Sequence, residues 1–129
     1  MHILIIRGNI DTPKSYPYWE ELLVLLKDHE IKEIKGILSE QETIDLVNWA
    51  DVVVTIDTFL PHMIKYHNLK TKVICLWGKS NPVHFGYPEN INLHLGKFRM
   101  DQYRWWKDVK WEKEDFVDSK TVFNAINML

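Results

Sequence analysis

Several features that would point to a particular class of protein are scarce or missing in this chain. Its single cysteine, Cys75, excludes a disulfide framework and a cysteine-based metal site. The apolar runs are only a few residues long, and the amino terminus lacks the basic start and continuous apolar core of a signal peptide. We therefore expect a soluble protein of the reducing cytosol, without a membrane span.

The chain also lacks a large excess of charge of either sign. With 16 basic and 18 acidic residues, its formal net charge is -2, which gives no overall attraction to nucleic acid or to an anionic membrane. The six histidines are scattered and include no ligand pair supported by carboxylates, so we expect neither a metal site nor a resident cofactor. No repeat or linker divides the 129 residues, which fit one domain.

The stretch from Ala50 to Gly78 has the pattern of a βαβ unit. Val52, Val53, Val54 and Ile56 form a short apolar run rich in β-branched side chains, which is typical of a strand buried on both faces of a parallel sheet. Residues 60–67 follow the period of a short amphipathic helix, and residues 72–77 form a second buried run. Parallel strands joined through a helix predict an open α/β sheet.

Similar patterns predict further elements on both sides of this unit. They are a buried strand over His2–Ile6, a helix over about Tyr18–Asp28, a half-exposed edge strand over Ile31–Lys35, a helix begun by the capping box of Ser39 and Glu42, an edge strand over Ile91–Leu95 and a closing helix over Ser119–Leu129. Residues 99–116 match neither period and are assigned no structure. We expect an α/β fold: a three-layer Rossmann-like domain with a parallel sheet of about five strands and about four helices.

Two loops follow the carboxyl ends of the central strands, where open α/β sheets bind ligands: residues 57–62 and 78–86. Asp57 and Thr58 precede a predicted helix whose free N–H groups and positive dipole end would hold a phosphate. Thr58 would add a hydroxyl donor, and Asp57 suits a ribose hydroxyl or a cation. The same two residue types are also favoured as N-caps, which would explain them without any ligand.

Three further polar residues are expected near this edge. His62, one turn into the helix, can donate a hydrogen bond to a phosphate oxygen, or it can simply pack or face solvent. Lys14 lies in a loop that is expected to cross the sheet edge, where it can neutralise a diphosphate or remain solvated. We predict that Asp57, Thr58 and His62 form one rim of a pocket, with Lys14 and Asn81 facing them.

Four short motifs follow one another along the chain. They are Lys14-x-Tyr16-Pro17, Ala50-Asp51 before an apolar run, Asp57-Thr58 with His62, and Leu76-Trp77-Gly78 with Asn81-Pro82. Together they resemble the carboxyl-terminal half of glycosyltransferase family 9, the ADP-heptose:lipopolysaccharide heptosyltransferases. The resemblance covers about residues 1–95. It implies a GT-B half that binds a nucleotide diphosphate or nucleotide sugar through Lys14, Asp57, Thr58, His62 and Asn81.

The chain departs from that family in ways that bear on catalysis. The family's amino-terminal domain, which supplies the acceptor site and the base, has no room here, and Phe59 replaces the glycine that follows the Asp-Ser/Thr pair. A strand and a helix before the Ile31 segment are also missing. We therefore expect a nucleotide-sugar-binding module without independent catalysis and assign no catalytic residue. The alternative is a small or split glycosyltransferase acting with a partner domain or a second copy.

A second resemblance concerns the run from Asp57 to Met63. It is similar to the sequence around the phosphoacceptor aspartate of response-regulator receiver domains, which implies a signalling domain with Asp57 as the phosphoacceptor. A receiver needs an acidic pair after its first strand to hold Mg²⁺, and Arg7-Gly8-Asn9 stands in that place.

Aromatic and basic residues are concentrated between Lys97 and Trp111. Exposed tryptophans and cations can bind nucleic acid, but nearby acidic residues cancel much of the positive field. We therefore expect no nucleic-acid partner. The segment from Tyr103 to Trp111 is predicted to cover the sheet or to form an interface with a protein partner or with another copy of the chain.

Overall fold

The computed structural model describes residues 1–8, 15–96 and 112–129. Its centre is a parallel sheet of five strands in the order β2-β1-β3-β4-β5. The strands are β1 (His2–Ile6), β2 (Glu30–Ile34), β3 (Val52–Ile56), β4 (Lys72–Leu76) and β5 (Ile91–Leu93). The prediction of an α/β fold with a parallel sheet of about five strands is confirmed.

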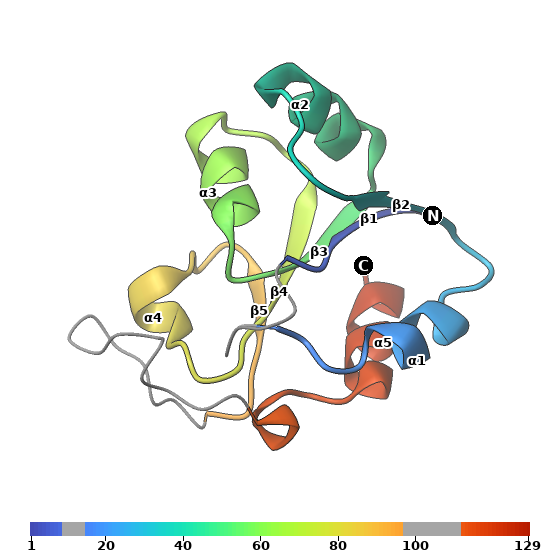
Figure 1. The fold of residues 1–129 in the computed structure, drawn as a ribbon, viewed down its shortest axis with the longest axis vertical. Coiled ribbons are helices and arrows are strands. Elements are labelled where there is room, and N and C mark those ends of the chain that lie inside the picture. The colour runs from blue at the N-terminus through green and yellow to red at the C-terminus, as the bar shows by residue number, and fades with distance from the viewer. Residues whose placement is uncertain (9–14, 97–111) are drawn as a thin grey trace.

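Helices cover both faces of this sheet. They are α1 (Trp19–Leu25), α2 (Glu40–Trp49), α3 (Phe59–Tyr66), α4 (Pro82–Phe85) and α5 (Ser119–Asn127), with a 3₁₀ turn, η2, at Lys113–Asp115. Figure 1 shows α2 and α3 on one side of the sheet, and α1 beside α5 on the other. The first helix after β1, α1, therefore packs against α5 near the end of the described chain.

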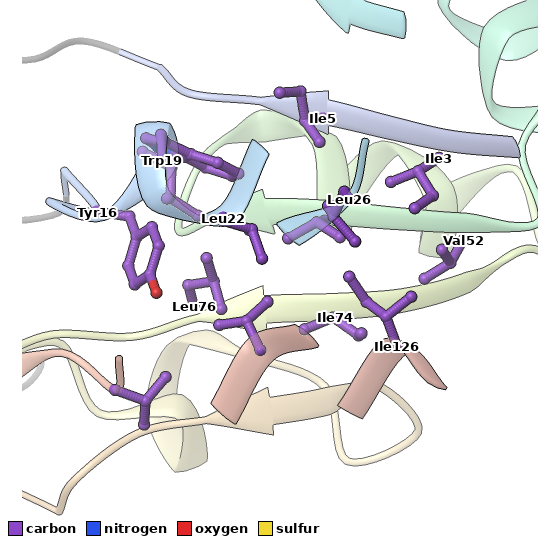
Figure 2. Packing of buried hydrophobic residues seen from close by; sticks show 14 of the residues in the cluster. Ile3, Ile5, Tyr16, Trp19, Leu22, Leu26, Val52, Ile74, Leu76 and Ile126 are labelled. Carbon is purple, nitrogen blue, oxygen red and sulfur yellow. The ribbon is translucent and has the colours of Figure 1, made fainter. Parts of the chain in front are cut away.

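The alternation of side chains along β1 divides the core into two halves. Ile3 and Ile5 are fully or almost fully buried under α1 and α5, where they join Trp19, Leu22 and Ile126 (Figure 2). On the opposite face, Leu4 and Ile6 pack with α2 and α3; this half of the core also includes Val47, Val53, Leu60 and Ile64. Both faces of the sheet are covered, which agrees with the nearly continuous apolar runs of the central strands, interrupted in β3 by the buried Thr55.

The predicted element boundaries agree with the structure to within a few residues. The strand predicted at residues 31–35 is β2 at one edge of the sheet, and the strand predicted at residues 91–95 is β5 at the other. At the start of α2, Ser39 Oγ accepts from the Glu42 amide at 3.1 Å, and Glu42 Oε1 accepts from the Ser39 amide at 3.2 Å. The predicted capping box is therefore present.

The structure differs from the sequence-based expectation in its short elements. The four-residue helix α4 was not predicted, because one turn cannot show a helical period. The turn η2 and the buried Phe116 fall within residues 99–116, which received no assignment. Lys14 and the predicted interface from Tyr103 to Trp111 lie outside the described residues. Within the described ranges, no helix combines the length and apolar content needed to cross a bilayer.

Candidate functional site

The chain changes direction across the sheet between β1 and β3. It runs outward from β1 to β2 and then returns to the other side of β1, so the loops that leave β1 and β3 diverge. In doubly wound sheets, ligands bind in the crevice at such a switch point. A hollow of about 500 Å³ lies here, and its lining includes Arg7, Gly8, Glu33, Gly36, Thr58 and Phe59.

Thr58 is the residue of this hollow that the sequence also singled out. It is the N-cap of α3 and has extended backbone angles, with φ -145° and ψ -171°, but its side chain makes no capping hydrogen bond. The first-turn N–H groups of Phe59 and Leu60 are therefore not occupied by the Thr58 hydroxyl, and Pro61, the third residue of the helix, has no N–H. Free N–H groups at the positive end of a helix dipole favour an anion.

Asp57 is half-buried between the end of β3 and Thr58. Its negative charge affects the buried Cys75. The burial of the Cys75 thiol is the larger cause, and the charge of Asp57 the second, of a thiol pKa well above its ordinary value. Cys75 lies on β4 and is fully buried. Asp57 thus brings negative charge to the carboxyl edge of the sheet, next to the start of α3.

Arg7 follows β1 directly and is the main cation of the hollow. Its Nη1 lies 2.6 Å from Glu20 Oε1, and its Nε lies 2.8 Å from Glu33 Oε1. Lys35 Nζ lies 3.8 Å from the other oxygen of Glu33. Because these charges largely offset one another, an anion in the hollow would depend on N–H groups and the Thr58 hydroxyl more than on Arg7. Arg7 is not among the ligand residues predicted from the sequence, although its position directly after a central strand was a usable signal.

A glycine with a left-handed backbone conformation, Gly8, lines the hollow. Gly8 has a positive φ of 66°, and a Cβ atom added to it would lie 2.7 Å from Cδ1 of Ile56. A side chain there would therefore have an unfavourable backbone conformation, and the terminal methyl group of Ile56 would have to shift. Glycine is therefore favoured at this position in the lining of the hollow.

His62 lies on α3 and contacts a different part of the chain. Its Nδ1 is 2.6 Å from the hydroxyl oxygen of Tyr87, and the two rings meet edge to face with centroids 5.4 Å apart. Tyr87 belongs to the loop between α4 and β5. His62 is exposed and is not among the residues that line the hollow. Phe59, on the same helix, does line it.

Asn81 has a structural role that accounts for its side-chain oxygen. It is the N-cap of α4, and its Oδ1 accepts from the Val83 amide at 3.0 Å, while Pro82 occupies the first helical position. Asparagine followed by proline is a strong helix-start signal. The predicted arrangement of Lys14 opposite Thr58 concerns a residue outside the described ranges.

Lys79 is a second basic residue that is not among the ligand residues predicted from the sequence. It follows β4, is only 6% exposed, and places Nζ 3.3 Å from Glu112 Oε1 and 3.4 Å from Asp115 Oδ2. These ion pairs connect the loop after β4 to the segment that precedes α5. A lysine three residues after a buried strand was the available signal, but its acidic partners are more than thirty residues away along the chain.

A hollow of similar volume lies at the opposite edge of the sheet. It is formed near the amino ends of β4 and β5, and its lining includes Ile64, Lys65, Lys70, Lys72, Glu89 and Leu129. Ligands of open α/β sheets bind outside the carboxyl ends of the strands, so we assign the candidate site to the hollow beside Thr58.

Comparisons with protein-family models, with curated proteins and with solved structures found no match for this chain. The residues at the carboxyl edge are therefore interpreted from their own geometry and chemistry.

Proposed function

We propose that this chain binds a nucleotide diphosphate or a nucleotide sugar at the carboxyl edge of its sheet and does not catalyse transfer on its own. The observation that supports this most directly is the start of α3 at the β1/β3 switch point. The Thr58 side chain makes no bond to the first-turn N–H groups of Phe59 and Leu60, and Thr58 lines a hollow of about 500 Å³. Both features suit a phosphate group.

In this proposal each residue of the edge has a chemical role. The α3 amides and the Thr58 hydroxyl donate to the diphosphate, and Asp57 accepts from a ribose hydroxyl. His62 donates to a phosphate oxygen from the next position along the helix face, and Lys14 adds a positive charge. Phe59, whose side chain is 50% exposed at the rim, offers an apolar ring surface to the base or sugar.

Sugar transfer would require more than this site. A general base must lie within hydrogen-bond reach of the acceptor hydroxyl, and no described residue combines that role with a defined acceptor position. A binding module is therefore the preferred proposal. A split glycosyltransferase, in which a partner domain or second copy provides the acceptor side, is the enzyme form of the same proposal.

Isothermal titration calorimetry with ADP, UDP, GDP and their sugars tests this function. We expect weak binding of at least one ligand and no sugar turnover by the isolated chain. Absence of heat across the whole panel would contradict the proposal. Turnover by the isolated chain would favour the enzyme over the module.

The strand order supports a second candidate function. Order 2-1-3-4-5 is that of flavodoxin-like sheets, including receiver domains, and Asp57 follows the third strand as a phosphoacceptor would. A six-stranded 3-2-1-4-5-6 Rossmann sheet without its third strand has the same order, so topology alone does not separate the two functions. Arg7, paired with Glu20 and Glu33, stands where a receiver needs an acidic residue for Mg²⁺.

Beryllofluoride distinguishes the two functions, because with Mg²⁺ it forms a phosphoryl-like adduct on a receiver aspartate. We expect no change in the amide NMR spectrum around Asp57 when beryllofluoride and Mg²⁺ are added. Shifts that are abolished by Asp57→Asn would favour the receiver function.

A further inference from the structure

The His62 ring is held by a residue from a different element. Tyr87, between α4 and β5, places its hydroxyl oxygen 2.6 Å from His62 Nδ1, a short hydrogen-bond distance. The edge-to-face arrangement, with an interplanar angle of 74°, fixes the plane of the imidazole as well as its position. No other hydrogen bond of the His62 ring occurs among the described residues, so Nδ1 is engaged and Nε2 is left for a ligand.

Tyr87 is anchored to the buried part of the sheet. Its carbonyl oxygen accepts from Asn92 Nδ2 at 2.9 Å and from the Asn90 amide at 3.1 Å. Asn92 also accepts, through Oδ1, from the indole nitrogen of Trp77 at 2.9 Å. Trp77 is 2% exposed, so this series of bonds runs from the interior to the tyrosine that contacts His62.

A second contact joins α3 to the same loop one helical turn further on. Lys65 forms an ion pair with Glu89, and its Nζ lies 5.7 Å from the centroid of the Tyr87 ring. Residues 62 and 65 are neighbours on the helix surface because they are three positions apart. The loop is therefore attached to α3 at two positions, His62 and Lys65.

The chemistry of the pair determines where the imidazole proton lies. A neutral imidazole has one N–H donor and one acceptor nitrogen, and the bond made by one nitrogen selects the role of the other. A tyrosine hydroxyl keeps its proton at neutral pH and donates readily to an unprotonated nitrogen. The O–H of Tyr87 then donates to Nδ1, which puts the proton of neutral His62 on Nε2.

We infer that Tyr87 is a positioning residue that holds His62 in the Nε2–H tautomer, so that the ring presents a hydrogen-bond donor to its ligand. This inference rests on the proposed function. A donor at Nε2 suits a phosphate oxygen or another acceptor of a nucleotide diphosphate. It does not suit a role for Nε2 as an acceptor or base.

Nitrogen-15 NMR of the full chain tests the inference without any ligand. Two-bond ¹H–¹⁵N correlations distinguish the two neutral tautomers, and His62→Gln identifies the His62 signals. At about pH 8.5, where an ordinary imidazole is neutral, we expect His62 to be the Nε2–H tautomer in the wild type. In Tyr87→Phe, which keeps the ring and removes the donor, we expect a mixture of tautomers.

Tyr66→Phe is the matched control. Tyr66 lies on the same helix, and its ring packs edge to face on that of His67, with centroids 4.9 Å apart. The substitution therefore removes the hydroxyl of a tyrosine that contacts a different histidine. It should leave the His62 spectrum unchanged. A wild-type proton on Nδ1, or a His62 spectrum that is the same in Tyr87→Phe, would overturn the inference.

Nucleotide titration separates this inference from the proposed function. Tyr87→Phe should weaken nucleotide binding roughly threefold to tenfold, the effect of one lost hydrogen bond, while Tyr66→Phe binds as the wild type does. If Tyr87→Phe changes the tautomer but binds the nucleotide normally, the positioning role is overturned. If the wild type binds no nucleotide although the Nε2–H tautomer is present and depends on Tyr87, the proposed function fails and the effect of Tyr87 on the tautomer is supported.

Discussion

Gly78 lies directly against the ring of Phe116. A Cβ atom added to residue 78 would be 2.4 Å from Cζ of Phe116 and 2.8 Å from Cε2. Phe116 is buried in the half of the core beneath α1 and α5. The glycine of the Leu76-Trp77-Gly78 motif is therefore required by packing against the carboxyl-terminal segment, without reference to a ligand.

Gly78→Ala should destabilise the fold, because the new methyl group has no space beside an immobile ring. We expect the free energy of unfolding, measured by urea denaturation, to fall by about 1 to 3 kcal/mol. Combining it with Phe116→Leu should give a loss smaller than the sum of the two single losses. Strict additivity of the two substitutions would show that residue 78 does not collide with the ring.

Asn92→Ala should also destabilise the fold, since it leaves the buried indole N–H of Trp77 without its acceptor. The expected loss is about 1 to 3 kcal/mol in urea denaturation. Asn124→Ala, at an exposed position of α5, is the control and should change the stability by less than about 0.5 kcal/mol. Equal effects of the two substitutions would argue against an important Trp77–Asn92 bond.

Stability should decrease at alkaline pH. Burial, followed by the charge of Asp118, raises the pKa of the Tyr16 phenol above its ordinary value of 10.0, and burial raises that of Cys75 above 9.0. Below these values both groups keep their protons in the folded and in the unfolded chain, and their full contribution to the free energy of unfolding is present. As the pH rises, the unfolded chain loses protons that the folded chain retains. The free energy of unfolding should therefore begin to fall near pH 9, and each group should contribute a slope of up to about 1.4 kcal/mol per pH unit.

Tyr16→Phe isolates one part of this pH dependence. It should flatten the decrease above pH 10 and leave the part between pH 9 and 10, which belongs to Cys75. At neutral pH the substitution should cost little, because the Tyr16 hydroxyl is buried with no hydrogen-bond partner among the described residues. A profile identical to that of the wild type above pH 10 would contradict the assignment to Tyr16.

Replacing two N-cap residues by alanine should have different effects on the free energy of unfolding. Asp118 caps α5 by accepting from the Thr121 amide at 2.8 Å, so Asp118→Ala should lower the free energy of unfolding by about 1 kcal/mol. The Thr58 side chain makes no capping bond, so Thr58→Ala should lower it by less than about 0.5 kcal/mol. We expect calorimetry to show instead that Thr58→Ala weakens nucleotide binding. A large loss of stability in Thr58→Ala would indicate that its role is structural.

Substitutions at the predicted ligand residues should affect binding selectively. Lys14→Ala and His62→Ala each remove a hydrogen-bond donor to a charged phosphate. We expect each to lower the binding free energy by about 1.5 to 3 kcal/mol, or roughly one to two decades in dissociation constant. Lys70→Ala, in the hollow at the opposite edge, should bind as the wild type does in the same titration. A loss of binding only in Lys70→Ala would move the site to that edge.

The regular part of the fold could be predicted because its signals are local. The β-branched run at residues 52–56 and the capping box of Ser39 and Glu42 each lie within a few residues. The ion pairs of Arg7 and the His62–Tyr87 bond instead join segments that are separated along the chain. Their partners depend on strand order and loop path, which no local pattern encodes. This is why the sequence could predict the edge of the sheet with the candidate site but not the contacts of its residues.

The two halves of the core also differ in when they can form during synthesis. The half beneath α2 and α3 uses residues from Leu4 to Val73, whereas the half beneath α1 and α5 needs Phe116, Val122 and Ile126. A chain emerging from the ribosome can therefore cover one face of its sheet while the other face still exposes Ile3, Ile5 and Val54. Chaperones that recognise apolar strands should bind this second face, and their release should depend on synthesis of α5.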